Sequence, residues 1–302
     1  MSLVNILKGG LQLAAILHNP ANSTGKAPGL VVVHPGGGVK EQAANLYAER
    51  FSKQGFVSVA FDALYQGSSE GLPRFLEDPD SRVSDVSAVV DYLQGLDNVD
   101  PNGIVVVGIC AGGGYSIAAA TVDHRIKAVA AVSLVNIGDS TRQGWLNTLD
   151  REDVFDVLED AKNRLQGTAT GGEPTLVNFL PEPAADVPPD LVDAWDYYRT
   201  PRGFYPTSQN VMAGASTPLL VRFDAWQFAG KYLTQPTLLI AGEDADSRWQ
   251  TDKIYDIVKD NNPNATKILV PGGRHMDFYD REPYVAPALA NITAFFNNAL
   301  GL

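Results

Sequence analysis

The sequence of 302 residues contains a single cysteine, Cys110, and only four histidines. One cysteine cannot form a disulfide within the chain, nor can it build a cluster of thiolates around a metal. A chain without disulfides fits a reducing compartment, so we expect a cytoplasmic protein. The lone cysteine therefore needs an explanation other than cross-linking.

Basic residues are also few: 23 Lys and Arg stand against 35 Asp and Glu, which gives a net charge of −12. Such an acidic surface repels phosphate backbones and anionic lipid, so we expect neither nucleic acid nor a membrane as partner. No apolar run reaches the roughly 18 residues of a membrane span. Residues 1–20 lack the basic cluster and the continuous apolar segment of a signal peptide. The composition, 45% hydrophobic and 19% charged, is that of a globular protein.

Short β-branched runs alternate with segments of helical periodicity along most of the chain. The runs are 30–34, 56–62, 103–110, 126–135, 236–242 and 266–272, and the helical segments are 41–54, 83–96, 113–121, 250–261 and 282–298. Apolar runs of this kind are typical of strands buried on both faces. The alternation predicts an α/β fold with a mostly parallel central sheet flanked by helices. Residues 3–6 and 11–17 predict an antiparallel hairpin at its edge.

The alternation breaks once, over residues 136–235, where no buried strand is evident. We expect residues 1–135 and 236–302 to form the core, and residues 136–235 to form a mostly helical cap over the carboxyl ends of the strands. An insertion between a strand and the next helix emerges at that end. The segment holds Trp145, Trp195 and Trp226. These side chains either pack the cap onto the sheet or line an apolar substrate pocket.

The only cysteine lies in Gly108-Ile109-Cys110-Ala111-Gly112, directly after one predicted strand and at the start of a helix. This pattern matches G-x-nucleophile-x-G, in which small flanking residues permit a sharp, strained turn that exposes the central side chain. We therefore predict Cys110 as the nucleophile. The N-terminus of a helix favours an anion, so we expect the pKa of this thiol to be lowered.

A nucleophile needs a base, and His275 follows the last predicted strand in the segment PGGRHMDFYD. In enzymes with this nucleophile turn, the catalytic histidine lies in the loop after the last strand, above the carboxyl ends of the strands. We expect His18 and His124 to be solvated surface residues. His34, which precedes three glycines, is interpreted as a residue that shapes its loop.

The third member of a triad is an acid that orients the imidazole. The strand ending at Gly242 is followed by Glu243, Asp244, Ala245 and Asp246, which agrees with the chain order nucleophile, acid, histidine. We favour Asp246 over Asp244, and Glu243 remains an alternative.

Two backbone N–H groups are needed to stabilise the oxyanion that forms when a carbonyl is attacked. We expect one donor from Ala111, directly after the nucleophile, and the other from the loop His34-Pro35-Gly36-Gly37-Gly38. The glycines do not form a nucleotide-binding motif. The segment at Cys110 lacks the lysine of a P-loop and the second glycine of a dinucleotide fingerprint.

Five segments together resemble the dienelactone-hydrolase-like α/β-hydrolases, a branch with many bacterial hydrolases and fungal polyketide-processing relatives. The segments are HPGGGVKEQ (34–42), FDALYQGSSEGLPR (61–74), GICAGGGY (108–115), DHRIKAV (123–129) and PGGRHMDFYD (271–280). The resemblance implies an α/β-hydrolase fold, Cys110 and His275 as nucleophile and base, and Gly37 and Ala111 at the oxyanion hole. Two departures stand out. The usual position of the acid falls on Ala245, and the insertion at 136–235 argues against a dienelactone as the physiological substrate.

These patterns predict a hydrolase that cleaves a small-molecule carboxylic ester, lactone or thioester through a Cys110 acyl-enzyme, without metal or organic cofactor. Two alternatives remain. An acyl or polyketide transferase would pass the same acyl group to an alcohol or amine, and a binding protein would keep the fold without turnover. The sequence does not determine the substrate, and it leaves open whether the chain forms a homodimer.

Overall fold

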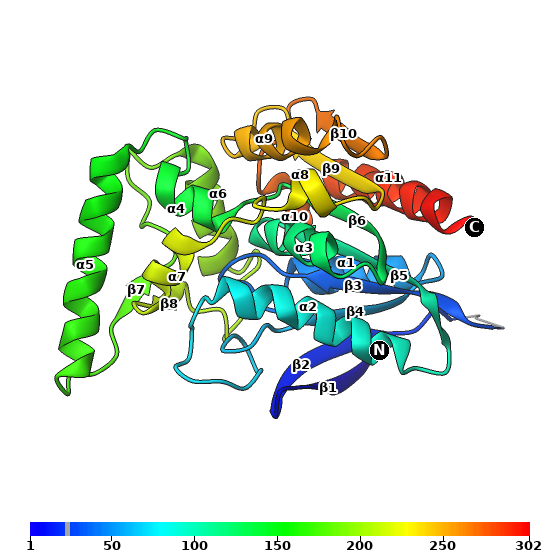
Figure 1. The fold of residues 1–302 in the computed structure, drawn as a ribbon, viewed down its shortest axis with the longest axis horizontal. Helices are drawn as coiled ribbons and strands as arrows, with labels where there is room; N and C mark the ends of the chain where they lie inside the picture. Colours follow the sequence, from blue (N-terminus) through cyan, green and yellow to red (C-terminus); the bar gives the residue numbers. More distant parts are fainter. Residues whose placement is uncertain (22–24) are drawn as a thin grey trace.

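The computed structural model describes residues 1–21 and 25–302, which contain a central sheet of eight strands. The strands follow the order β1-β2-β4-β3-β5-β6-β9-β10 (Figure 1). Their bounds are β1 Ser2–Lys8, β2 Leu11–His18, β3 Ala27–Val33, β4 Val57–Phe61, β5 Val99–Ile109, β6 Ile126–Val132, β9 Thr237–Gly242 and β10 Ala265–Val270. The strands from β4 to β10 pair in parallel, whereas β1 and β2 form an antiparallel hairpin at the edge. The predicted mostly parallel α/β sheet with its edge hairpin is confirmed.

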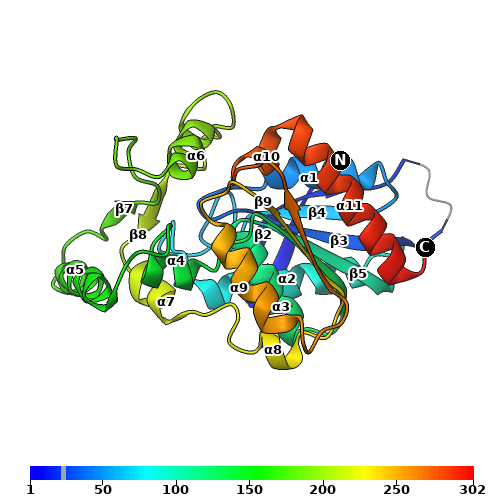
Figure 2. The ribbon, with the colours of Figure 1, turned by 90° about the horizontal axis from the view of Figure 1, so that it is seen from above.

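The parallel strands are apolar because helices cover both faces of the sheet. Along β3, Val31 and Val33 face one apolar cluster while Leu30 and Val32 face the other, as the alternation of side chains along a strand requires. Figure 2 shows α1 and α11 over one face and α2, α3, α8 and α9 over the other. The bounds are α1 Ala43–Ser52, α2 Pro79–Gln94, α3 Ala111–Val122, α8 Ala229–Tyr232, α9 Arg248–Val258, α10 Asp277–Asp280 and α11 Glu282–Leu300.

Residues 136–224, which we call the cap segment, leave the sheet after β6 and lie to one side of it in Figures 1 and 2. The elements are α4 Ile137–Gln143, α5 Arg151–Ala169, β7 Leu176–Asn178, α6 Pro189–Arg199, β8 Val211–Ala213 and α7 Ser216–Arg222. The antiparallel pair β7-β8 was not predicted, because each strand has only three residues and neither shows a buried apolar run. Residues from 225 onward differ from the rest of the insertion, since Ala225, Ala229 and Leu233 join the core cluster under α3 and α9.

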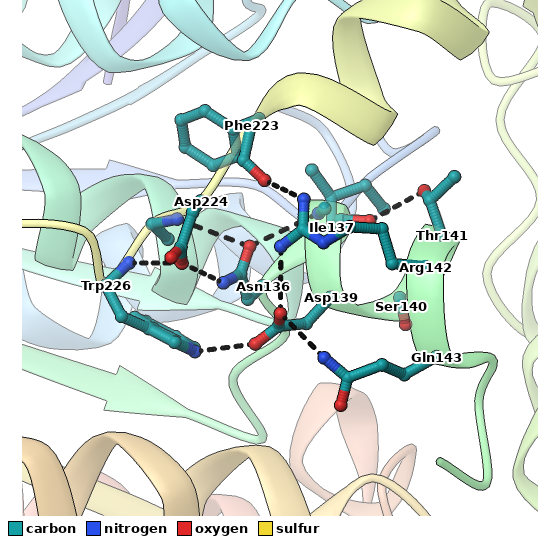
Figure 3. A network of polar contacts seen from close by, with 12 residues as sticks. Asn136, Ile137, Asp139, Ser140, Thr141, Arg142, Gln143, Phe223, Asp224 and Trp226 are labelled. Atoms are coloured by element: carbon teal, nitrogen blue, oxygen red, sulfur yellow. Dashed lines mark hydrogen bonds and ion pairs between the residues drawn. The ribbon is translucent and has the colours of Figure 1, made fainter. Parts of the chain in front are cut away.

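The two ends of the cap segment are tied together by a network of hydrogen bonds (Figure 3). Asn136 Nδ2 donates to Asp224 Oδ1 at 2.8 Å, and Trp226 Nε1 donates to Asp139 Oδ2 at 3.0 Å. Lys253 of α9 reaches the same Asp139 oxygen at 2.8 Å. Buried polar groups need such partners, so the network fixes where the chain leaves the core and where it returns.

None of the helices in the described ranges combines the length and the apolar character that crossing a membrane would require.

Candidate active site

Cys110 lies at the turn between β5 and α3, with a φ of 56° that non-glycine residues rarely adopt. The flanking glycines explain how the chain reaches this conformation. A Cβ on Gly108 would lie 2.2 Å from the carbonyl oxygen of Gly112, and a Cβ on Gly112 would lie 2.3 Å from that of Val33. Glycine is therefore required on both sides of Cys110, as the G-x-nucleophile-x-G pattern implies.

The Cys110 sulfur accepts hydrogen bonds from two backbone N–H groups, those of Ala111 and Gly36, and from the Tyr279 hydroxyl. Burial raises the pKa of the Cys110 thiol, although these three donors act in the opposite direction. The expectation of a lowered thiol pKa is therefore wrong, because the loss of hydration at this buried turn outweighs the helix N-terminus.

The second backbone donor comes from Gly36 rather than from Gly37. Gly37 adopts a φ of 66°, and its carbonyl oxygen accepts a hydrogen bond from Ser208 Oγ at 2.7 Å. It therefore shapes the turn, while its neighbour presents the N–H group. The sequence located the loop, but nothing in a run of three glycines tells which N–H points at the Cys110 sulfur.

The His34 side chain fixes the conformation of the glycine loop through hydrogen bonds at both ring nitrogens. Its Nδ1 lies 2.6 Å from the carbonyl oxygen of Pro35, while Nε2 accepts from the Ala63 N–H at 3.1 Å and from the Arg82 guanidinium at 2.8 Å. Burial and the Arg82 charge hold the pKa of His34 well below its usual value. The imidazole thus stays neutral with both nitrogens occupied, in line with a loop-shaping role.

His275 is buried in the loop between β10 and α10. Its Nδ1 lies 2.7 Å from Ser247 Oγ, and its Nε2 lies 3.5 Å from the Tyr279 hydroxyl. Burial lowers the pKa of His275 to about 3. Because Tyr279 contacts both the sulfur and the imidazole, it joins the two residues that the sequence singled out. The sequence gives no helical-spacing signal for this hydroxyl, because α10 begins at Asp277 and His275 precedes it.

The predicted acids do not face the imidazole. Asp244 and Glu243 are exposed. Asp246 Oδ2 instead accepts the backbone N–H of Asp190 at 3.2 Å. Ser247, directly after Asp246, occupies the position beside Nδ1 where the prediction placed Asp246 or Asp244. The prediction fails because the loop after β9 turns Asp246 toward α6 of the cap segment.

Asp190, at the start of α6, completes this link between cap segment and core. Its carboxylate accepts the backbone N–H of Asp246 at 2.7 Å and also that of His275. Burial and the nearby Asp246 charge raise the pKa of Asp190 to about 6. Asp190 of the cap segment therefore holds the backbone of the candidate base and that of the loop after β9.

Of the other histidines, His124 is exposed as expected. His18 is 5% exposed, and its Nε2 lies 2.8 Å from Asn45 Oδ1, so the prediction of a surface residue is wrong for it. Its strand, β2, pairs with β4 on one side and contacts α1, which buries the ring. Within residues 1–21 and 25–302, no three His, Cys, Asp or Glu side chains gather in a way that could hold a metal ion.

A cavity of about 340 Å³ opens above Cys110 and His275, and the cap segment supplies most of its wall. None of the lining residues is Asp, Glu, Lys or Arg. Apolar wall residues include Val135, Ile137, Val157, Phe179, Leu180, Leu191, Met212, Leu220 and Met276. Such a wall favours an uncharged, apolar group next to the sulfur.

The three tryptophans of the insertion have different positions. Trp145 lines the cavity, with its ring centroid 4.9 Å from that of His275. Trp226 packs in the core cluster and bonds Asp139, so its predicted role at the substrate is wrong (Figure 3). Trp195 is half-buried and is not among the residues that line the cavity. It lies one residue beyond Ala194, which does face the cavity, and successive helical residues point in different directions.

Comparison with known proteins agrees with this geometry. The alpha/beta hydrolase family model matches residues 30–288. The chain belongs to the alpha/beta hydrolase family. It is 40% identical over 303 residues to the uncharacterized protein YcjY of Escherichia coli K12, covering 99% of this chain and 98% of that protein.

Two further similarities bear on the site. The chain is 34% identical over 264 residues to thiohydrolase aneE of Aspergillus aculeatus, covering 84% of this chain and 77% of that protein. The crystal structure of the hypothetical protein PA2218 from Pseudomonas aeruginosa superposes with a TM-score of 0.93 at 32% identity, covering 99% of this chain and 93% of that one. Family membership, together with relatives named as hydrolases, supports hydrolase activity for this chain.

Proposed function

We propose that this protein hydrolyses a carboxylic ester, lactone or thioester through an acyl-enzyme on Cys110. The observation that carries the proposal is the arrangement around the sulfur. A strained turn holds it between two backbone N–H donors, at the floor of an apolar cavity that His275 also lines. With a cysteine at this turn, we assign the chain to the cysteine branch that resembles dienelactone hydrolases.

In the first half of the reaction, Cys110 attacks the substrate carbonyl and its proton passes to His275 Nε2. The N–H groups of Gly36 and Ala111 donate to the oxyanion, each contributing roughly 3–4 kcal/mol by analogy with measured oxyanion holes. When the tetrahedral intermediate collapses, the bond to the leaving oxygen or sulfur breaks, and His275 protonates that atom.

In the second half, a water molecule attacks the acyl-enzyme. His275 removes its proton, the carbonyl oxygen again becomes an oxyanion, and the carbon–sulfur bond breaks. Cys110 recovers a proton, and the carboxylic acid leaves. The balance is one water consumed per bond cleaved, with no oxidant, reductant or metal in the sequence of steps.

Ser247 takes the orienting role in this scheme. With Nδ1–H donating to Ser247 Oγ, the Nε2 lone pair faces the cavity and can accept a proton. A hydroxyl carries no charge, so the resting pair is a neutral thiol and a neutral imidazole. The directions of the pKa shifts of both groups support this assignment.

The substrate side of the proposal rests on the cavity wall. Its lack of charged residues favours an uncharged acyl chain, and the name of thiohydrolase aneE favours a thioester among the three classes. We further propose that the cap segment selects the substrate, because it supplies most of the wall.

The test is a screen of p-nitrophenyl esters, lactones and acyl thioesters, with intact-mass detection of the acylated protein. The expected result is turnover of at least one uncharged substrate, with an added mass equal to its acyl group that Cys110→Ala abolishes. Turnover by Cys110→Ala at the wild-type rate would refute the proposal. An added alcohol or amine that diverts most of the acyl group from water would favour the transferase alternative.

A further inference from the structure

The cavity wall holds one buried hydroxyl whose hydrogen has no acceptor, and it belongs to Tyr198 of α6. Tyr198 is 5% exposed and lines the cavity. The Tyr279 hydroxyl approaches its oxygen, but no acceptor for the Tyr198 hydrogen lies among the described residues. Two other hydroxyls of the wall have partners. The Thr141 hydroxyl donates to the carbonyl oxygen of Ile137, and Ser140 Oγ accepts from Gln250.

A buried hydroxyl hydrogen without an acceptor is unfavourable, and native structures contain few such groups. The ring of Tyr198 already packs against Tyr197 and Tyr279, with centroids 5.0 and 6.4 Å apart. A phenylalanine would make the same ring contacts without that cost, so packing alone does not account for a tyrosine at this position.

The position of the hydroxyl restricts what it can contact. Tyr198 Oη lies beside the Tyr279 hydroxyl, which in turn donates to the Cys110 sulfur. It also lies next to the glycine loop, 3.3 Å from where a Cβ on Gly38 would be. A substrate atom that accepts the Tyr198 hydrogen would therefore lie close to the Tyr279 hydroxyl and the glycine loop, in the neighbourhood of the Cys110 sulfur.

We propose that Tyr198 donates a hydrogen bond to a second oxygen of the substrate, carried on carbon 2 or carbon 3 of the acyl chain. The substrate class is then a 2- or 3-oxygenated acyl ester or thioester, such as a 3-hydroxyacyl or 3-oxoacyl thioester, with an apolar remainder that the cavity takes up. This inference rests on the proposed Cys110 chemistry and makes the cap segment the part that recognises the substrate's polar group.

Trp145 provides a second donor in the cavity wall, beside His275. Its Nε1 is buried and has no partner among the described residues, and its ring lies edge-on to His275. Two unpaired donors in a wall without charged residues suit a substrate with oxygen atoms close to the scissile bond, whereas a plain fatty acyl chain would leave both unsatisfied.

The test compares kcat/KM for 3-hydroxyacyl, 3-oxoacyl and unsubstituted acyl thioesters of equal chain length, in wild type and in Tyr198→Phe. Wild type is expected to prefer an oxygenated substrate by about tenfold or more, because the unsubstituted chain leaves the hydroxyl unpaired. Tyr198→Phe is expected to bring that ratio close to one by slowing only the oxygenated substrate. Tyr197→Phe is the matched control, since Tyr197 is buried one position earlier and is not among the residues that line the cavity.

Thermal unfolding of each variant separates loss of folding from loss of recognition. An equal loss on all three substrates would overturn the inference, since Tyr198 would then act on the scissile carbonyl or on the structure. Equal wild-type rates on all three would overturn it as well, while leaving the proposed function intact. If wild type hydrolyses none of the three but turns over an ester or lactone of the screen, this inference fails and the proposed function stands. If it turns over no substrate of either set and forms no acyl-enzyme, the proposed function itself fails.

Discussion

Replacing Ser247 by alanine tests the most unusual feature of the site, a hydroxyl in place of the triad carboxylate. The variant removes the partner that lies 2.7 Å from His275 Nδ1. Both groups are buried, Ser247 at 2% and His275 at 1% exposed, so solvent does not readily replace the lost partner.

The expected loss follows from the chemistry of that hydrogen bond. A buried donor left without a partner costs about 1–3 kcal/mol, and each 1.36 kcal/mol in the barrier is a factor of about ten in rate. We therefore expect Ser247→Ala to lower kcat by roughly 5- to 150-fold, with a small change in KM, because the bond strengthens when the imidazole becomes charged. Loss of an orienting triad carboxylate costs much more, about 10⁴-fold.

The assay measures kcat and KM on the best substrate of the screen, under conditions where chemistry limits turnover. Ser247→Thr, which keeps a hydroxyl, should lie closer to wild type than Ser247→Ala. Asp246→Asn should lose less than about tenfold, because an amide oxygen can still accept the Asp190 N–H. Asp244→Asn is the control for loss of one acidic charge from the same loop, since Asp244 is exposed.

The opposite ranking would refute this reasoning. If Asp246→Asn cost 10³-fold or more while Ser247→Ala stayed within threefold of wild type, Asp246 would be the orienting acid after all, and the loop after β9 would rearrange during turnover.

Three further predictions follow from the same contacts. Because burial raises the pKa of Cys110, the rate of its alkylation by iodoacetamide should still increase above about pH 9, beyond the range of an ordinary thiol; a plateau below pH 8 would contradict the neutral resting pair. Gly112→Ala should lower the free energy of unfolding, measured by urea denaturation, by about 1–3 kcal/mol. The reason is that the alanine Cβ would lie 2.3 Å from the carbonyl oxygen of Val33. An unchanged midpoint of urea denaturation would contradict the steric argument. The pKa of Asp190 is raised to about 6, so the free energy of unfolding of wild type should fall as pH rises from about 4 to 6. Asp190→Asn should therefore be more stable than wild type by about 1–3 kcal/mol above pH 6 and equally stable below pH 4. A lower melting temperature of the variant at pH 7.5 would show instead that the carboxylate stabilises the fold.

The sheet and the turn at Cys110 followed from the sequence because both depend on neighbours along the chain. Runs such as 103–110 are apolar on both faces because helices cover both faces of the sheet. The structural strand is longer, Val99–Ile109, because its first residues pair with β3 outside the apolar run. The glycines at 108 and 112 are fixed by contacts within one strand, one turn and one helix, so the pattern alone located Cys110.

The partners of the two reactive groups could not be predicted this way. Asp246 and Ser247 are adjacent, and either could reach an imidazole by sequence position. The choice depends on Asp190, 56 residues earlier, whose carboxylate and backbone N–H hold Asp246 away from His275. Gly36 and Gly37 differ only in where their N–H groups point in the folded loop.

Order along the chain therefore determined the α/β sheet, the turn at Cys110, the loop of His275 and the break in strand–helix alternation after β6. Tertiary structure alone decided that Ser247 faces the imidazole, that burial raises the pKa of the thiol, and that Trp226 packs in the core while Tyr198 lines the cavity. The physical reason is the separation along the chain over which each effect acts. Backbone conformation and apolar periodicity act over a few residues, whereas hydration and hydrogen-bond partners are set by groups that only folding brings together.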